Sequence, residues 1–288
     1  MQDRFYREIE DFLLSGGVHC EEVRAGSIIV LKARLQCRGL ERELYILPAG
    51  ITARTPEEAM SHRSERLAAR KYMESQDPRT GIVTVAEDRW RRLGELYRKR
   101  LLAHLGDFRS IFARKCRAVR TDRATAGAFL EKNHDYGSAN CRYCYCLEET
   151  SGGSIVAAAT FSNARKWQKG DREIRSYEWV RYASEAGIRI PGGMGKLLST
   201  FINEVKPDDI MSYADLEWSD GEVYRKLGFS AESTKSPVMF DIDTMDWSRT
   251  PVPHAGYVAP ESRPREGHLW YLNEGSLKYR LKLTDYQE

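Results

Sequence analysis

The sequence predicts an α/β protein with a smaller N-terminal α+β domain, on three observations. The 288 residues are 41% hydrophobic and 30% charged, which is typical of a chain that folds into a globular protein. Residues 1–108 suggest the order α-β-β-α-β-α, and from Ser110 the order becomes β-α-β-β-β-α-β-α-β-β. A tail with four prolines follows. The predicted domains are therefore 1–108, of unknown role, 109–245, and an extension 246–288 that packs on the domain 109–245.

The N-terminal elements follow from apolar spacing and helix-capping residues. Thr55 and Pro56 predict a helix start, because a hydroxyl caps free amides and proline suits the first helical turn. Tryptophan, leucine and tyrosine at helical spacing predict a long helix later in the segment. The predicted elements are a helix over 3–14, a hairpin with strands over 27–35 and up to 48, a helix over 55–74, a strand over 82–85 and a helix over 86–105.

The second domain alternates apolar strands with shorter helices. Helix starts are marked by Thr121 and Asp122 and by a glycine-bearing loop before Lys196. The predicted elements are strands over 110–119, 141–147, 154–161, 174–183, 210–216, 229–233 and 238–242, and helices over 121–132, 196–205 and 219–227.

The glycine-bearing loop is the first segment that points to a ligand. Gly192, Gly193 and Gly195 lie between a strand and a helix. Glycines let the backbone approach a ligand closely, and the first amides of a helix are unpaired at the positive end of its dipole. This pattern favours binding of phosphate oxygens. A glycine-rich turn that only begins a helix is the alternative.

A second motif follows about thirty residues later, at Tyr224-Arg225-Lys226-Leu227-Gly228-Phe229. Together with the glycine turn, it resembles the Gcn5-related N-acetyltransferase (GNAT) superfamily over residues 110–242. The resemblance implies a mixed, twisted sheet that splays at its middle and is flanked by helices. It also implies that acetyl-CoA or another acyl-CoA binds in the cleft as cosubstrate.

The resemblance assigns roles to several residues. Tyr224 would be the general acid for the CoA thiolate, or else a packed core tyrosine, and Glu178 is the candidate general base, or else a structural carboxylate. The family's usual Arg or Gln before the glycines is here Ile190, with Arg189 one place away. The backbone amides that would hold the pyrophosphate are those of Gly192, Gly193, Met194, Gly195 and Lys196.

A narrower resemblance concerns several short collinear motifs. They are Asn133-His134-x-x-Gly137, Ser176-Tyr177-Glu178 with Arg181, Gly192-Gly193 with Lys196-Leu197-Leu198, and Tyr213-Ala214-Asp215. They are similar to a divergent GNAT-like branch found in phage and mobile-element proteins, including Mom-type enzymes that modify DNA bases. This kinship implies that Asn133, Tyr177 and Arg181 bind the acceptor and that His134 or Asp215 shares proton transfer with Glu178. A helix-terminal structural role is the alternative for His134.

Cysteine usage and targeting features suggest a cytoplasmic protein. Cys141 and Cys144 have C-x-x-C spacing, but no second pair follows at zinc-finger distance, so we expect no metal site and six free thiols. No apolar run approaches the roughly 20 residues of a membrane span, so we expect no membrane partner.

The net charge of +3 is too small to indicate a polyanionic partner by itself. Its distribution is uneven, because the segment from Arg89 to Arg120 carries eleven basic residues and two acidic ones, a balance of +9. Such a segment suits a nucleic acid, although charged runs are also typical of solvated helix faces.

Three functions remain open from the sequence. The first is acyl-CoA-dependent transfer of an acyl group to an amine, whose acceptor is a small molecule or a macromolecule. The second is Mom-like modification of a nucleic-acid base. The third is a catalytically inactive GNAT-like binding protein, in which Ile190 marks a lost cofactor site. The sequence predicts no oligomeric state.

Overall fold

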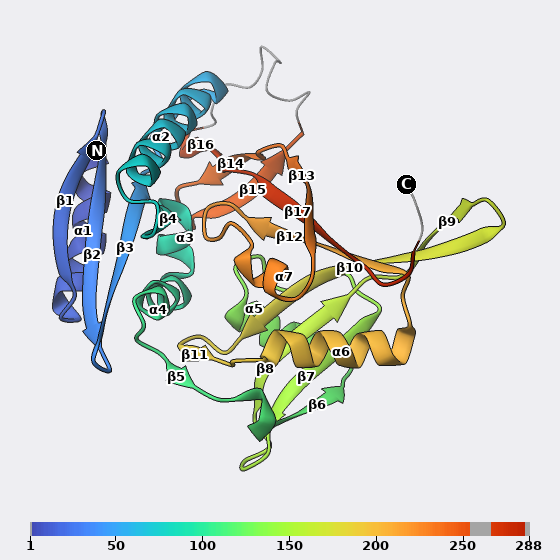
Figure 1. Ribbon diagram of the computed structural model, residues 1–288. Helices are drawn as coiled ribbons and strands as arrows, with labels where there is room; N and C mark the ends of the chain where they lie inside the picture. The colour runs from blue at the N-terminus through green and yellow to red at the C-terminus, as the bar shows by residue number, and fades with distance from the viewer. Residues whose placement is uncertain (1, 254–265, 286–288) are drawn as a thin grey trace. The chain divides into compact units, whose positions relative to one another are not determined.

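The computed structural model describes residues 2–253 and 266–285. The chain divides into two compact units, and each is built from segments that are distant in sequence. Unit 1 comprises residues 1–107, 215–220 and 234–276, and unit 2 comprises residues 108–214, 221–233 and 277–288 (Figure 1). Both units combine sheets with flanking helices, so the predicted α/β fold class is confirmed.

Unit 1 contains two sheets among its described residues. A four-stranded sheet has the order β1-β2-β3-β4, and a three-stranded sheet has the order β15-β14-β16. The elements are α1 (Gln2–Ser15), β1 (His19–Ala25), β2 (Ile28–Cys37), β3 (Leu40–Ala49), α2 (Pro56–Gln76), β4 (Gly81–Ala86), α3 (Glu87–Arg92), α4 (Gly94–His104), β14 (Met239–Asp243), β15 (Ser248–Val252) and β16 (His268–Leu272).

Local chemistry explains the helix boundaries in unit 1. The Thr55 side chain accepts a hydrogen bond from the Glu58 amide, as the sequence predicts for the start of α2. The helix predicted over 86–105 is instead two helices, because the backbone leaves the helical region at Leu93 (φ −116°, ψ 32°). Trp90 and Tyr97 are still buried in one core, so the apolar spacing indicated burial correctly but not continuity.

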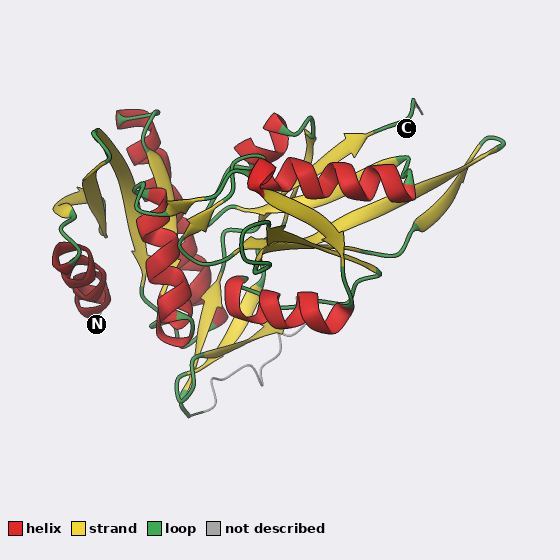
Figure 2. Cartoon of the chain, turned by 90° about the horizontal axis from the view of Figure 1, so that it is seen from below, coloured by secondary structure: helices red, strands yellow, loops and turns green. Residues whose placement is uncertain are grey.

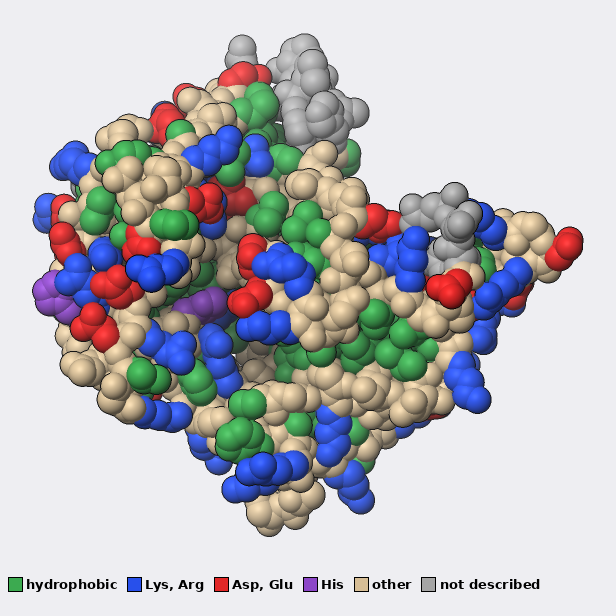
Figure 3. All heavy atoms as spheres, in the orientation of Figure 1, with side chains coloured by type: hydrophobic (Ala, Val, Ile, Leu, Met, Phe, Trp, Pro, Cys, Tyr) green, Lys and Arg blue, Asp and Glu red, His purple; other side chains and the backbone are tan. Residues whose placement is uncertain are grey.

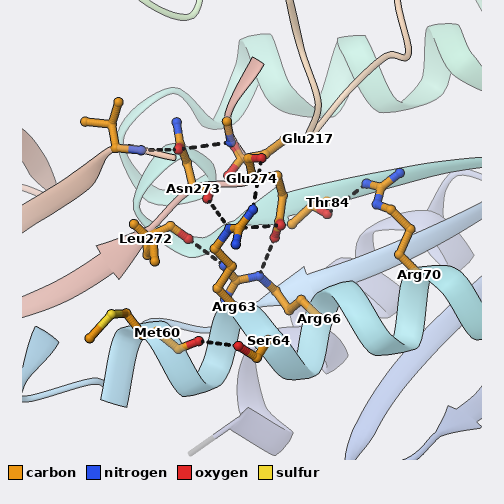
Figure 4. Close-up of polar contacts among 12 residues, drawn as sticks. Met60, Arg63, Ser64, Arg66, Arg70, Thr84, Glu217, Leu272, Asn273 and Glu274 are labelled. Carbon is orange, nitrogen blue, oxygen red and sulfur yellow. Dashed lines mark hydrogen bonds and ion pairs between the residues drawn. The ribbon is translucent and has the colours of Figure 1, made fainter. Parts of the chain in front are cut away.

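A buried polar network joins α2 to the C-terminal part of unit 1 (Figure 4). Arg66 donates from Nε to Glu274 Oε1 (2.9 Å) and from Nη2 to the Leu272 carbonyl (2.6 Å). Glu217 accepts a hydrogen bond from the Tyr271 hydroxyl at 2.5 Å. Arg66, Glu217 and Glu274 are at most 4% exposed. The network therefore connects the three chain segments of unit 1.

Unit 2 is built on a larger mixed sheet. Its described strands have the order β13-β17-β12-β10-β8-β7-β6, and β9 pairs with β10. The elements are β5 (Arg109–Ser110), the 3-10 turn η1 (Ala113–Lys115), β6 (Cys116–Arg120), α5 (Arg123–Asn133), β7 (Tyr143–Glu149), β8 (Ile155–Phe161), β9 (Arg165–Lys169), β10 (Arg172–Ser184), β11 (Ile188–Arg189), α6 (Gly193–Val205), β12 (Asp209–Asp215), α7 (Glu222–Lys226), β13 (Ser230–Lys235) and β17 (Ser276–Lys282).

Helices α5 and α6 cover opposite faces of this sheet (Figures 1 and 2). Leu130 of α5 packs on Cys146, Ala158 and Ala183. On the other face, Phe201 of α6 lies parallel to Phe161, with ring centroids 3.9 Å apart. Side chains alternate between faces along each strand, so neighbouring residues of one strand serve different cores.

The last strand of the large sheet differs from the prediction. The predicted strand over 238–242 is β14, which belongs to unit 1, where Phe240 and Ile242 pack with Ala49 and Ala86. The large sheet instead takes β17 from the predicted extension. Residues 246–253 and 266–276 likewise group with unit 1, rather than with the domain predicted over 109–245.

No helix within the described ranges is long and apolar enough to cross a membrane.

Candidate active site

Two neighbouring parallel strands of unit 2 separate in the middle of the sheet. Strand β10 pairs with β12 only where Ser176 to Glu178 face Asp209 to Met211. Both strands continue beyond these positions, and β10 remains paired with β8 as far as Ser184. The sheet therefore opens after Glu178, and the GNAT resemblance implies such a splay at the middle of the sheet. We call this opening the wedge.

Strand β10 also changes register at this point. Its pairing with β8 shifts between Trp179 and Arg181, which marks a β-bulge. Bulges twist a strand locally and re-aim its side chains, and they are common next to active sites. On the side that faces β12, the Trp179 carbonyl accepts a hydrogen bond from the Ser212 hydroxyl at 3.0 Å. A side chain thus takes the place of backbone pairing at the wedge.

Tyr224 of α7 reaches the same place. Its hydroxyl lies 2.9 Å from Ser212 Oγ. The single Ser212 proton can be donated to the Trp179 carbonyl or to the phenol oxygen, and the Tyr224 hydroxyl itself donates to the Tyr213 carbonyl at 3.5 Å. Burial raises the pKa of Tyr224 above its usual value. The phenol therefore keeps its proton at neutral pH and can donate it.

Aromatic packing holds this phenol in position. The Tyr224 ring stacks on Tyr279 of β17, with centroids 5.3 Å apart and an angle of 23° between planes. A Cβ at Gly221 would lie 2.2 Å from the Tyr279 ring, so only glycine permits this approach. Sequence reasoning missed Ser212, Gly221 and Tyr279, although alternation of Leu277, Tyr279 and Leu281 is a strand pattern that could have identified β17.

The glycine-bearing segment forms the start of α6, which begins at Gly193 rather than at the predicted Lys196. Gly192 has φ of 79° and lies at the N-cap of this helix. The Gly193 amide is bonded to the Ile190 carbonyl (2.8 Å) and the Lys196 amide to the Gly192 carbonyl (3.0 Å). The amides of Gly192, Met194 and Gly195 have no hydrogen-bond acceptor within the described part of the chain. They lie at the positive end of the helix dipole, which favours a phosphate group.

Two of the five residues predicted to hold the pyrophosphate make other contacts. A Cβ at Gly193 would lie 2.9 Å from Ile190 Cγ2 and 3.2 Å from Leu147 Cδ1, so this glycine serves packing. Lys196 Nζ donates to the Ala113 and Cys116 carbonyls. Ile190 itself is buried in the core at 8% exposure, which accounts physically for an apolar residue at this position.

Glu178 and Arg181 lie on the strand segment where the wedge begins. Glu178 is half-buried, and no hydrogen bond or ion pair of its carboxylate is found among the described residues. Arg181 donates from Nε to the Gly137 carbonyl at 3.3 Å, and its guanidinium lies 5.9 Å from the Tyr136 ring centre. Burial lowers the pKa of Arg181, and the Glu178 charge acts in the opposite direction. The loop after α5 therefore covers this part of β10.

The other predicted acceptor residues are placed differently. Asn133 Nδ2 donates to the Phe129 carbonyl (3.0 Å), and its Oδ1 accepts from the Ala186 amide (2.9 Å). His134 ends α5, and its Nδ1 accepts from the Tyr136 amide at 3.0 Å. Both side chains contact backbone groups of unit 2.

Tyr177 and Asp215 make contacts of their own, in the α6 core and in unit 1 respectively. The Tyr177 ring packs edge-on against Phe201 of α6, with centroids 5.4 Å apart, on the face opposite Glu178. Asp215 ends β12 and groups with unit 1, where its Oδ1 accepts from the Glu217 amide (3.0 Å). Within unit 2, the structure thus brings together Glu178, Arg181 and the loop after His134, and it separates them from Tyr177.

The basic segment from Arg89 to Arg120 does not form one surface of either unit. Its first half belongs to unit 1 and its second half to unit 2. Arg91 pairs with Glu8 and Glu87, and Arg117 pairs with Glu148. Figure 3 shows basic and acidic side chains side by side on the face that it draws.

The cysteines are free thiols in the structure. Cys141 Sγ lies 3.4 Å from Cys144 Sγ, and burial raises the pKa of Cys144 to about 12. No group of three or more metal-ligating side chains occurs in the ranges that the structure describes.

Comparison with known proteins gives likenesses of fold only. No protein-family model matches the chain, and no curated protein matches it. Among solved structures, ribosomal-protein-S5-alanine acetyltransferase from Vibrio fischeri has a TM-score of 0.35 and 8% identity, over 60% of this chain and 96% of that chain. A GNAT-family acetyltransferase from Bacillus anthracis has a TM-score of 0.33 and 11% identity, over 58% and 95%. A mutant of the toxin AtaT, bound to the C-terminus of the antitoxin AtaR and acetyl-CoA, has a TM-score of 0.28 and 11% identity, over 55% and 93%.

Proposed function

We propose that the protein transfers an acyl group from an acyl-CoA to an amine. The observation that carries this proposal is the separation of β10 from β12 after Glu178, with the Tyr224 phenol directed into it. An opened pair of parallel strands offers unpaired backbone to an extended ligand, and the α6 N-terminus of the same unit offers unpaired amides to its phosphates. Acetyl-CoA has both parts, so the residues fit this cosubstrate.

The reaction requires one proton to leave the amine and one to reach sulfur. The amine nitrogen attacks the thioester carbonyl, the C–S bond breaks, and an amide forms. The Tyr224 hydroxyl donates its proton to the departing thiolate, and Ser212 and Tyr279 hold the phenol in place for this step. The raised pKa of Tyr224 keeps that proton available at neutral pH.

Glu178 is the proposed base for the amine. Its carboxylate is half-buried on the strand that borders the wedge, and Arg181 follows three residues later. Proximity of the two reactants within the wedge supplies much of the rate, because it converts a bimolecular step into an effectively unimolecular one. Proton transfer through Glu178 adds about 10²–10⁴-fold.

Calorimetry with acetyl-CoA tests the proposal, and Gly195→Asp is the decisive variant. The Gly195 Cβ would make only ordinary contact with Leu227 Cδ2, at 3.4 Å, and an acidic side chain in the first turn suits the helix dipole. The variant should therefore fold normally but repel the pyrophosphate and bind acetyl-CoA at least about tenfold more weakly. Gly195→Asn, which has the same shape without the charge, should retain most of the affinity.

Two results would contradict the proposal. If the wild-type protein gives no binding heat with acetyl-CoA, acetyl-CoA is excluded as its cosubstrate. Equal affinity of Gly195→Asp and Gly195→Asn would place the phosphates elsewhere.

A further inference from the structure

A pocket of about 340 Å³ lies beneath α5, on the face of the sheet opposite α6. Helix α5, the loop that follows it and strand β8 form its wall. Gly127 lies in the interior of α5, where glycine is unfavourable, and a larger side chain there would occupy this space. The lining residues are Arg123, Gly127, Leu130, Ser138, Ala139, Asn140, Cys141 and Thr160.

A buried hydroxyl in this wall lacks a partner. Thr160 is 2% exposed, and its Oγ1 has no hydrogen bond in the described part of the chain. Leaving a buried hydroxyl unbonded costs stability, and an isosteric apolar residue would avoid that cost. Thr160 therefore indicates a ligand that completes this hydrogen bond.

The remaining polar groups of the pocket are mainly donors. Arg123 Nη2 donates to Asn140 Oδ1 at 2.6 Å, so the Asn140 amide nitrogen retains its own protons for a ligand. The Ser138 hydroxyl donates to Glu131 Oε1 at 2.5 Å, which leaves Ser138 Oγ as an acceptor. A positive charge beside several donors suits an anionic oxygen group, and the planar guanidinium suits a carboxylate in particular.

The pocket lies close to the candidate base. Thr160 and Ser162 point to the same face, about 7 Å apart along the chain. Ser162 exchanges two hydrogen bonds with Glu178: its amide donates to the Glu178 carbonyl (2.9 Å), and its Oγ accepts from the Glu178 amide (2.9 Å). The Glu178 backbone is therefore bonded to a residue only two positions from Thr160.

We propose that this pocket binds the carboxylate end of the amine acceptor, which makes the acceptor a small amino carboxylate. Arg123, Asn140 and Thr160 bind the carboxylate, and the amine at the other end of the molecule reaches Glu178. This inference rests on the proposed acyl transfer for the role of the amine, but the binding of the carboxylate can be tested by itself.

The binding test uses Cys141, which lines the pocket and is half-buried. Alkylation of Cys141 by iodoacetamide is followed by peptide mass spectrometry, with Cys37 of unit 1 as the internal control. The probes are ω-amino acids from β-alanine to 6-aminohexanoate and the n-alkylamines of equal length. We expect at least one amino acid to slow alkylation of Cys141 several-fold, with no effect of the alkylamines and no change at Cys37.

Two variants tie this protection to the proposed contacts. Thr160→Val and Arg123→Gln should each raise the concentration needed for protection by about tenfold. Thr160→Val should leave the melting temperature unchanged or higher, which separates lost binding from lost folding. Arg117→Gln removes the same charge from β6, outside the pocket lining. In this variant the amino acid should protect Cys141 at the same concentration as in the wild-type protein. Lack of protection by every amino acid overturns the proposal, and so does protection that survives in both variants.

Turnover distinguishes failure of this inference from failure of the proposed function. Wild-type protein with acetyl-CoA should acetylate the protecting amino acid at least about tenfold better, in kcat/KM, than the matched alkylamine. Equal rates for the two amines would retain acyl transfer and reject the carboxylate site. Protection of Cys141 without transfer to any amine would reject acyl transfer and retain the site. Protection by phosphoethanolamine but by no carboxylate would overturn the assignment of ligand class.

Discussion

One set of polar groups in unit 1 and one set in unit 2 are used in opposite ways. In unit 1, Arg66 and Glu274 are almost fully buried, and Arg66 is bonded to the Glu274 carboxylate and to the Leu272 carbonyl. In unit 2, the Glu178 carboxylate and the amides of Met194 and Gly195 have no hydrogen-bond partner within the described ranges. The first set stabilises its unit, whereas the second remains available to a ligand.

The difference shows that the extent of burial distinguishes a structural polar group from one that can bind a ligand. A fully buried charge must be paired inside the protein, because desolvation without a partner costs several kcal/mol. A half-buried group such as Glu178 is still hydrated and can exchange that water for a substrate. A reaction site is therefore expected where two strands separate and leave polar groups half-buried. A structural network is expected where polar groups are fully buried and paired.

The largest expected effect is on stability and comes from removing one carboxylate of the buried network in unit 1. Glu274→Ala leaves the Arg66 guanidinium buried without its carboxylate, so the free energy of unfolding should fall by about 3–5 kcal/mol. Urea unfolding followed by tryptophan fluorescence measures it. Glu95→Ala removes an exposed partner of Lys99 and should leave the midpoint unchanged. Equal effects of the two variants would remove the distinction between buried and exposed pairs.

Next in size is the effect on catalysis of removing the proposed base. Glu178→Gln keeps the size of the side chain but cannot accept a proton, so kcat should fall about 100-fold. Steady-state rates at saturating acetyl-CoA measure this fall, with acetyl-CoA affinity as control. A variant whose kcat equals that of the wild type would exclude Glu178 as the base.

A smaller effect is expected at the proposed acid. Tyr224→Phe retains the stacking on Tyr279 and removes only the hydroxyl, so kcat should fall about tenfold while the KM for acetyl-CoA changes little. Water can replace the phenol as proton donor, which limits the loss. A rise in KM with unchanged kcat would make Tyr224 a binding residue rather than an acid.

A separate, pH-dependent effect concerns a buried acid of unit 1. Burial, with a contribution from the Asp215 charge, raises the pKa of Glu217 to about 8. The folded protein then keeps a proton that the unfolded chain releases above its ordinary pKa of 4.5, so stability falls as pH rises from about 4.5 to 8. Glu217→Gln should flatten this slope, as measured by urea unfolding from pH 5 to 9. A constant difference between variant and wild type would place the pKa of Glu217 outside this range.

Local sequence patterns predicted many of the elements that form the site. The predicted strand over 174–183 is β10 (Arg172–Ser184), and the predicted helix over 196–205 lies within α6 (Gly193–Val205). Apolar alternation and glycine placement determine such elements locally. Strand β1 was missed, because it is mostly exposed and has few apolar residues.

Partners that are distant in sequence could not be predicted in the same way. Tyr279 lies in the predicted C-terminal extension, where no strand of the large sheet was expected, yet it is fully buried against Tyr224. The neighbour of Asp215 in the chain, Ala214, belongs to the other unit. Only long-range packing decides such pairings.

Residue order and composition by themselves determined the fold class, the glycine turn before α6 and the strand that carries Glu178, since each depends on neighbouring residues. Tertiary structure alone decided that β10 and β12 separate after Glu178, that Ser212 and Tyr224 meet there, and that Thr160 has an unbonded hydroxyl. The physical reason is that these features depend on which groups remain unpaired after the whole chain has packed. The partners of each group come from distant segments, so no single segment determines them.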